Sequence, residues 1–112
     1  MLDIVGNRIY LTRGDSALID LKIVDEAGLP YEYVPGDKIY FRMKENAFTN
    51  VLLLVKEIDA ETLRLELKPE DTSNLGFFPY RYEVELVTAQ GYRFTVIENA
   101  EIVIGVELGS RE

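Results

Sequence analysis

The segment Tyr80–Leu86, with the sequence YRYEVEL, decides the fold class of this chain. Its tyrosine, valine and leucine side chains alternate with arginine and glutamate, so an extended backbone would carry one apolar face and one charged face. A period of two residues is typical of a β-strand that buries one face, whereas a helix needs a period of about 3.6 residues. The same alternation recurs along the chain, which predicts an essentially all-β protein.

Working outward from this segment, we expect short strands that are separated by turn residues. The predicted strands are Asn7–Leu11, Ser16–Val24, Lys38–Lys44, Val51–Ile58, Thr62–Lys68, Tyr80–Val87, Tyr92–Ile97 and Ala100–Leu108. The turn residues 59–61 predict a hairpin between the fourth and fifth of these strands. Residues 89–91 predict another hairpin between the sixth and seventh, and the pair 98–99 predicts a break before the last strand.

One segment departs from the β pattern. Residues 69–76, with the sequence PEDTSNLG, have proline where a helix may start, acids in its first turn and glycine where it would stop. We therefore predict one short helix within Pro69–Leu75. Seven to eight strands with one helical crossover favour an immunoglobulin-like β-sandwich, with a small barrel as the second choice. Tyr80 or Tyr82 is a candidate for the tyrosine corner of such a sandwich.

Composition excludes much of enzyme chemistry. The 112 residues include 20 acidic and 12 basic ones, for a net charge of -8, and no histidine, cysteine or tryptophan. Catalytic triads, thiol nucleophiles, disulfides, zinc sites with histidine or cysteine ligands and iron–sulfur clusters are therefore excluded. The length predicts a single domain, residues 1–112.

Charge and hydropathy also bear on partners. The basic residues are scattered singly and the net charge is negative, so nucleic acid is not an expected partner. The longest apolar run, Val51–Val55, is too short to cross a membrane, and no basic region with a following apolar stretch is found at residues 1–3. We expect synthesis in a cytoplasm and no membrane partner.

The matches of this sequence to known site motifs are weak. Arg13-Gly14-Asp15 matches the tripeptide that integrins bind, but glycine and aspartate are also what a tight turn requires, and we favour the turn. Paired carboxylates are expected to be solvated rather than catalytic, and Asp25-Glu26-Ala27-Gly28 only faintly resembles a calcium loop. We predict no catalytic, cofactor-binding or metal-binding residues. The carboxylate pairs are Asp25 with Glu26, Asp59 with Glu61, Glu70 with Asp71, and Glu83 with Glu85.

Nine of the twelve aromatic residues fall into two groups. Alternation places Phe41, Tyr82 and Phe94 in the core. The others lie in predicted loops or at outward positions, where packing under loops is favoured and a binding surface is the alternative. These residues are Tyr31, Tyr33, Tyr40, Phe48, Phe77 and Phe78.

The order of the turn motifs resembles a known family. The segments Ile9–Asp15, Asp25–Tyr31, Leu67–Thr72 and Tyr80–Leu86 together resemble small phage tail and baseplate proteins, with the N-terminal domain of baseplate upper proteins of Gram-positive (pro)phages as the nearest pattern. Phe77-Phe78-Pro79 departs from the Pro-Gly that usually precedes the tyrosine. The resemblance implies an immunoglobulin-like or similar β-sandwich that works by assembly, with no catalytic residues.

On this resemblance, the expected function is that of a structural protein of a phage tail, baseplate or neck, located in the virion. Its partners would be other phage structural proteins and further copies of itself. A carbohydrate- or surface-binding module is the alternative, and a small hydrolase is a third class. We expect Ala100–Leu108 to be a weakly guarded edge strand, because Glu101 and Glu107 are its only charges, and Val103 to lie outside the core.

Overall fold

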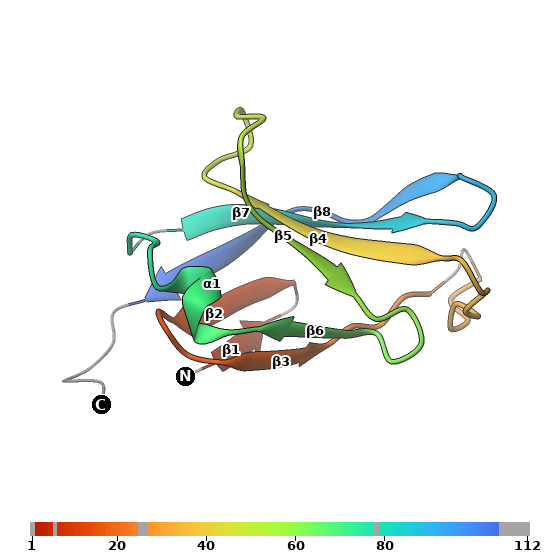
Figure 1. Cartoon of the computed structure of the whole chain (residues 1–112), viewed down its shortest axis with the longest axis horizontal. Helices are drawn as coiled ribbons and strands as arrows, with labels where there is room; N and C mark the ends of the chain where they lie inside the picture. Colours follow the sequence, from red (N-terminus) through yellow and green to blue (C-terminus); the bar gives the residue numbers. More distant parts are fainter. Residues whose placement is uncertain (1, 6, 25–26, 78, 106–112) are drawn as a thin grey trace.

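The computed structural model describes residues 2–5, 7–24, 27–77 and 79–105, the first four as backbone only, and these residues are mostly β-strand with one short helix (Figure 1). The prediction of an all-β protein is confirmed. The elements are β1 (Leu2–Val5), β2 (Arg8–Thr12), β3 (Ala17–Asp20), β4 (Lys38–Lys44), β5 (Leu52–Ile58), β6 (Arg64–Leu67), α1 (Pro69–Thr72), β7 (Pro79–Val87) and β8 (Arg93–Gly105).

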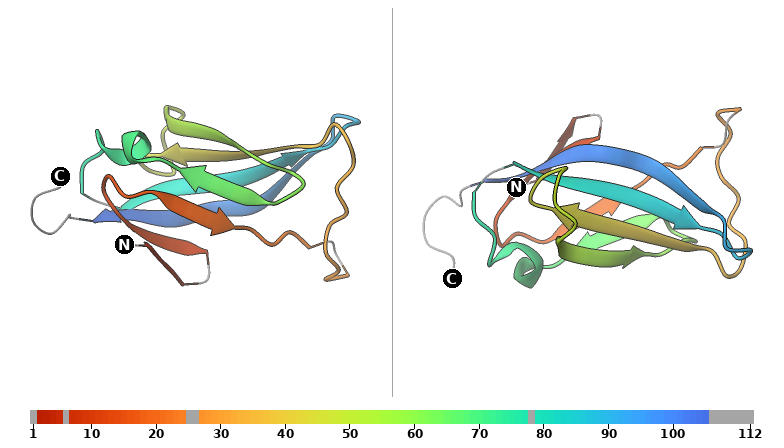
Figure 2. Two further views of the ribbon diagram at one scale, coloured as in Figure 1. Left: turned by 60° about the horizontal axis from the view of Figure 1, so that its bottom comes forward. Right: turned by 90° about the horizontal axis from the view of Figure 1, so that it is seen from above.

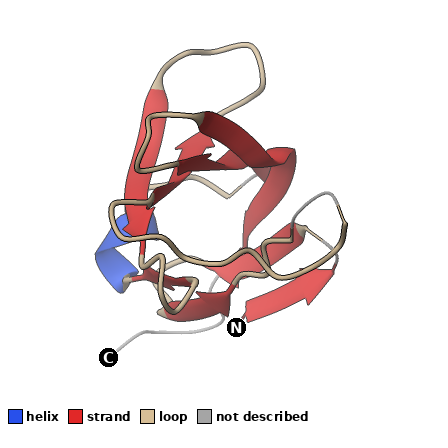
Figure 3. Ribbon diagram, turned by 90° about the vertical axis from the view of Figure 1, so that its right-hand side faces the viewer, coloured by secondary structure: helices blue, strands red, loops and turns tan. Residues whose placement is uncertain are grey.

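The strands form two sheets. The larger has six strands in the order β1-β2-β8-β7-β4-β5, and the smaller pairs β3 with β6. All neighbouring strands are antiparallel except β2 and β8, which run parallel. In two further views, β3 and β6 lie across from the middle of the larger sheet (Figure 2). A view along the long axis shows strands on all sides of a common interior (Figure 3).

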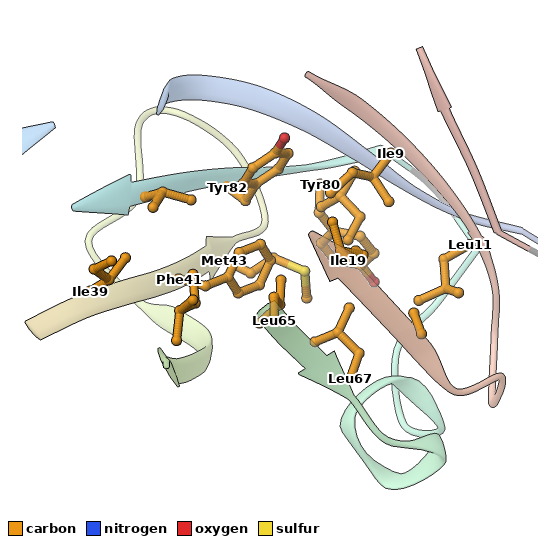
Figure 4. Packing of buried hydrophobic residues seen from close by; sticks show 14 of the residues in the cluster. Ile9, Leu11, Ile19, Ile39, Phe41, Met43, Leu65, Leu67, Tyr80 and Tyr82 are labelled. Carbon is orange, nitrogen blue, oxygen red and sulfur yellow. The ribbon is translucent and has the colours of Figure 1, made fainter. Parts of the chain in front are cut away.

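The core lies between the two sheets. Side chains of β4 and β7 point toward those of β3 and β6 (Figure 4). The rings of Phe41 and Tyr82 stack with centroids 5.2 Å apart, which confirms both as core residues. The alternating burial of β4 and β7 follows their sequence alternation, with every second residue buried. The buried hydrophobic residues are Ile9, Leu11, Ala17, Ile19, Ile23, Ile39, Phe41, Met43, Ile58, Leu65, Leu67, Tyr80, Tyr82, Val84, Leu86, Ile102 and Ile104.

Helix α1 begins at Pro69, as predicted, and connects the smaller sheet to the larger. The Asp71 carboxylate accepts a hydrogen bond of 2.8 Å from the Lys68 backbone N–H, which caps the first turn. The buried Thr72 hydroxyl accepts a 2.9 Å hydrogen bond from the backbone N–H of Gly14. The helix is thereby tied to the turn between β2 and β3.

The predicted hairpin between residues 51–58 and 62–68 is wrong. β5 pairs with β4 and β6 pairs with β3, so the two segments belong to different sheets. The connection between them turns sharply at Leu63, which has a φ of 56° and whose N–H donates to the Asp59 carbonyl at 2.7 Å. This turn carries the chain from one sheet to the other. The same turn residues would also fit a hairpin, so they do not predict which of the two forms.

Several further strand boundaries differ from expectation, and the predicted strand Ser16–Val24 is reduced to β3, Ala17–Asp20. Leu2–Val5 forms a strand that pairs with β2, where no strand was predicted. The expected break at residues 98–99 is instead an irregularity inside β8, where Asn99 has a φ of 45° and the pairing with β7 shifts register nearby. The hairpin between β7 and β8 is confirmed.

The expectation that Ala100–Leu108 is an edge strand is also wrong. Its described part, residues 100–105, belongs to β8 and lies between β7 and β2; Glu107 and the rest of 106–108 lie outside the described residues. Val103 is opposite Tyr10 on one side and Pro79 on the other. The parallel pairing with β2 covers this strand, and period-two alternation carries no information about such a distant partner.

Phe94 was expected in the core and is 53% exposed. It lies opposite the buried Leu86 on β7. However, β2 pairs with β8 only from Ile102 to Gly105, so Phe94 lies on a part of β8 beyond that cover. Alternation predicts the face of a residue but not where the neighbouring strand ends.

Candidate interaction surface

Among the strands whose side chains the structure describes, β5 exposes the most apolar residues, and it lies at one edge of the six-stranded sheet. Leu52, Leu53 and Val55 are 42%, 40% and 48% exposed, and Val51 just before the strand is 67% exposed. No strand of the described part of the chain pairs with the outer side of β5. We call residues 51–55 the apolar edge.

A β-bulge and the alternation of exposed and less exposed residues determine which side chains of the apolar edge face the core and which face outward. Lys44 is opposite Leu52 and Met43 is opposite Leu54, so Leu53 has no opposite residue on β4. From Leu53 to Ile58 the exposed and less exposed residues alternate, with Leu54 on the core side and Val55 on the outer side. A bulge leaves the extra residue outside the ladder.

The charged residues that follow the apolar edge are engaged in ion pairs. The Lys56 ammonium lies 2.9 Å from the Asp71 carboxylate on α1, on the core side of the strand. The Glu57 carboxylate lies 3.2 Å from the Lys38 ammonium across the sheet. Natural edges are often protected by lysine or proline at outward positions, and residues 51–55 contain neither. The bulge at Leu53 is the one protective feature of this segment.

A polar hollow of about 250 Å³ lies on the outer face of the larger sheet. Arg81 donates a hydrogen bond of 3.4 Å to the Asn99 carbonyl beside it. Tyr82 is the aromatic residue of the lining, but its ring is buried and its hydroxyl donates to the Asn7 carbonyl; burial raises the pKa of this hydroxyl to about 12. The hollow therefore lacks a stacking ring for a sugar. Its lining comprises Arg42, Lys44, Ala47, Arg81, Tyr82, Glu83, Glu98 and Asn99.

In each described carboxylate pair, one member has a structural partner. Asp59 accepts from the backbone N–H groups of Glu61, at 2.8 Å, and Thr62, at 3.3 Å, which forms its turn. On the outer face of the sheet, the Glu85 carboxylate lies 3.1 Å from Arg42 and 2.9 Å from Arg93.

For the remaining pairs, Asp71 caps α1 as described above and its neighbour Glu70 is exposed. Asp25 and Glu26 lie outside the described residues. Among the described residues no group of three or more acidic side chains is placed to hold a metal ion.

The one deeply buried carboxylate is Asp37, among the described residues. It accepts hydrogen bonds from the Tyr31 hydroxyl at 2.6 Å and from the backbone N–H groups of Val34 and Ala89 at 3.1 and 3.0 Å. Burial alone would raise the pKa of Asp37, but these three hydrogen bonds together hold the pKa below its ordinary value. The bond to Asp37 raises the pKa of Tyr31 to about 12. This network joins the loop before β4 to the β7–β8 hairpin.

The Arg13-Gly14-Asp15 segment is a turn. Gly14 has a φ of 80°, and the Asp15 N–H donates to the Thr12 carbonyl at 3.1 Å. The Arg13 guanidinium lies 4.1 Å from the ring centroid of Phe77. The arginine therefore packs on a neighbouring aromatic side chain.

The loop aromatics differ in exposure. Phe48 is 97% exposed in the β4–β5 connection, and Phe77 is 44% exposed in the connection between α1 and β7. Tyr31 packs against the core, Tyr33 is exposed and Tyr40 is half-buried. Phe78 lies outside the described residues.

Comparison with models of known protein families gives no match, and neither curated proteins nor solved structures give a significant one. No helix within the described ranges is long and apolar enough to span a membrane.

The apolar edge was not predicted as a site. The run Val51–Val55 was assigned to a strand and excluded as a membrane span, although five successive apolar residues in a strand also break the alternation that a half-buried strand should have. That break was the signal that both faces of this strand are apolar.

Proposed function

We propose that this chain is a non-enzymatic assembly protein of a (pro)phage tail, baseplate or neck, that it resides in the virion, and that it acts through protein–protein contacts. The observation that carries the proposal is the apolar edge, residues 51–55 of an edge strand. An exposed apolar edge strand is a template for pairing with another chain. The resemblance of the turn motifs to phage baseplate proteins supplies the biological setting.

We further propose that the fold is an immunoglobulin-like β-sandwich. The antiparallel pair β3–β6 would correspond to strands B and E, and the adjacent strands β4, β7 and β8 to strands C, F and G. β5 would then be C′, the addition found in variable-type domains. The order and the sheet membership of the strands support this assignment.

Side chains at the equivalent positions support it as well. The Tyr80 hydroxyl donates a 3.1 Å hydrogen bond to the Gly76 carbonyl, four residues upstream at the entry to β7, as a tyrosine corner does. Phe41 on β4 stacks on Tyr82 of β7, where antibody domains have a tryptophan against a disulfide. An aromatic pair would replace the disulfide in a chain without cysteine.

The proposed function is tested by reconstitution with the proteins encoded beside this gene. We expect the wild type to form a stable complex with at least one of them. Val55→Lys, which places a charge on the outer face of the edge, should lose that complex, whereas Phe94→Lys, at an equally exposed position on β8, should keep it. The absence of any complex, or a complex that Val55→Lys does not weaken, would contradict the proposal.

A second candidate function, carbohydrate binding, would rest on the polar hollow, because guanidinium and carboxylate groups can bind sugar hydroxyls even where no ring of the lining is free to stack on a sugar. Titration with neutral and acidic oligosaccharides tests it. Under the assembly proposal no oligosaccharide binds; binding that Arg81→Ala abolishes would favour the carbohydrate function instead.

A further inference from the structure

The four strands with a free side in the described structure differ in what they offer a partner. β1, β3 and β6 have four residues each, whereas β5 has seven. The exposed positions of β6 are Arg64 and Glu66, and β3 alternates an exposed Leu18 with an exposed Asp20. Only β5 combines length with adjacent exposed apolar residues. A partner edge that matches β5 in length is therefore present in this protein only on another β5.

The sequence of the apolar edge is self-complementary around Leu54. In an antiparallel copy centred on Leu54, the residues Leu53, Leu54 and Val55 meet Val55, Leu54 and Leu53, so three successive apolar residues face apolar residues. Beyond them, Leu52 faces Lys56 and Val51 faces Glu57 of the copy. Residues that face each other across antiparallel strands share a sheet face, so the register must preserve the inward and outward sets. Alignment about Leu54 satisfies this condition, because Leu54 on the core side meets itself and Leu53 on the outer side meets Val55 of the copy.

We propose that two copies of the chain pair through their β5 strands, antiparallel about a two-fold axis at Leu54, so that their six-stranded sheets become continuous. This inference rests on the proposed assembly function and names the first partner of that edge as a second copy. Two Leu53 and two Val55 side chains gather on the outer face at the axis. Leu53, which the bulge leaves without an opposite residue on β4, gains one on the copy.

The contact is isologous, so it closes at two copies. A ring or a tube of the particle then has the dimer as its building unit and needs a second kind of contact. The charge of -8 on each chain opposes the approach of two copies. Because salt screens repulsion between exposed charges, the dimer should tighten as the salt concentration rises.

Size-exclusion chromatography with light scattering tests the dimer on the full chain. We expect a mass about twice the 12.8 kDa of one chain, with a dissociation constant that falls at least about tenfold between roughly 0.05 and 0.5 M sodium chloride. Val55→Lys should be monomeric at concentrations where the wild type and the matched control Phe94→Lys are dimeric. Circular dichroism and thermal melting establish that both variants are folded.

Cysteine cross-linking tests the register, since the natural chain has no cysteine. Residues directly opposite each other in an antiparallel pair bring their Cβ atoms to about 5 Å, within reach of a disulfide after small adjustment. Leu54→Cys should therefore oxidise to a covalent dimer. Leu53→Cys mixed with Val55→Cys should give more mixed dimer than either gives alone, and Leu18→Cys on β3 should stay monomeric.

The outcomes separate this inference from the proposed function. A wild type that stays monomeric at every salt concentration, or a dimer that persists in Val55→Lys, overturns the self-pairing. If such a monomer still binds a neighbouring gene product through Val55, the assembly function stands with a different partner. If Val55→Lys affects neither association, both proposals fail. A dimer with efficient linkage through Leu18→Cys instead of Leu54→Cys places the contact on β3 and overturns the register.

Discussion

β5 and the last half of β8 have similar apolar sequences, but β5 lies at the edge of the larger sheet and β8 lies in its interior. Ile102 and Ile104 of β8 are almost fully buried between β2 and β7, whereas Leu53 and Val55 of β5 are about half exposed at an edge. Composition does not distinguish the two segments, because both are runs of branched apolar residues with few charges. The difference comes from the neighbours that each strand acquires. An exposed apolar strand is thus recognised by its place in the sheet.

The largest effect is expected from a substitution in the buried segment, the last half of β8. Ile102→Ala removes a side chain with 0% exposure between the two sheets and should lower the free energy of unfolding by about 3 kcal/mol, through lost burial and the cavity that remains. Urea unfolding followed by circular dichroism measures the change. The matched control Val55→Ala in β5 should cost less than about 1 kcal/mol; equal losses would mean that β5 is buried in the free chain.

The next largest effect concerns the hydrogen-bond network of Asp37, which holds the β7–β8 hairpin. Asp37→Ala leaves the Tyr31 hydroxyl and two backbone N–H groups without their acceptor, which should cost about 2 kcal/mol. Exposed Asp20, which pairs with Arg64 on the surface, serves as the control through Asp20→Ala. If both variants unfold at the same urea concentration, the network around Asp37 adds nothing to stability.

The same carboxylate predicts a pH dependence. The pKa of Asp37 is lower in the folded chain than in the unfolded chain, so its contribution is complete above the unfolded value of about 3.9 and is lost as the pH falls through the folded value. Thermal melting between about pH 5 and pH 2 should therefore show a smaller decline for Asp37→Asn than for the wild type. Identical declines would contradict the shift.

A smaller effect is expected from a substitution of Val103, which the sequence placed on an exposed edge strand. In the structure Val103 is half-buried on an interior strand between Tyr10 and Pro79. Val103→Lys should cost about 1 kcal/mol, because the lysine stem can lie along the sheet while its ammonium reaches water, and it should leave association unchanged. Loss of association without loss of stability would restore β8 as the edge.

The smallest expected effect on stability is at β5 itself. Val55→Lys should change the free energy of unfolding of the monomer by less than about 0.5 kcal/mol, because the outer face at this position is open to solvent. Urea unfolding at a concentration below the dimer range measures it. A large loss would mean that the association experiments with this variant report misfolding.

Much of the local structure follows from the sequence. The alternation of Tyr80–Leu86 predicts a strand and its buried face, and Pro69 with the acids after it predicts the start of α1. Strand partners are not predictable in this way, since Leu63 turns the chain between sheets where a hairpin was expected. The exposure of Phe94 depends on where β2 ends, which is set by pairing across most of the chain.

The candidate site shows the same limit. That Val51–Val55 is apolar is plain from the sequence, but its place at the edge depends on β4 pairing with β7 on the other side. The network of Asp37 with Tyr31 and Ala89 likewise joins residues that local patterns do not connect.

The parallel pairing of β2 with β8 has a consequence for how the chain folds. Ile9 is opposite Ile102, a separation of 102 − 9 = 93 residues, so the larger sheet cannot be completed until nearly all of the described chain is present. Closure of so long a loop places this protein among the slow folders, with relaxation times of milliseconds to seconds. During synthesis the β4–β5 hairpin forms earlier, because its strands adjoin in sequence. Nascent chains on neighbouring ribosomes would therefore expose this hairpin before their own sheets are complete, and co-translational encounter would be a route to the proposed dimer.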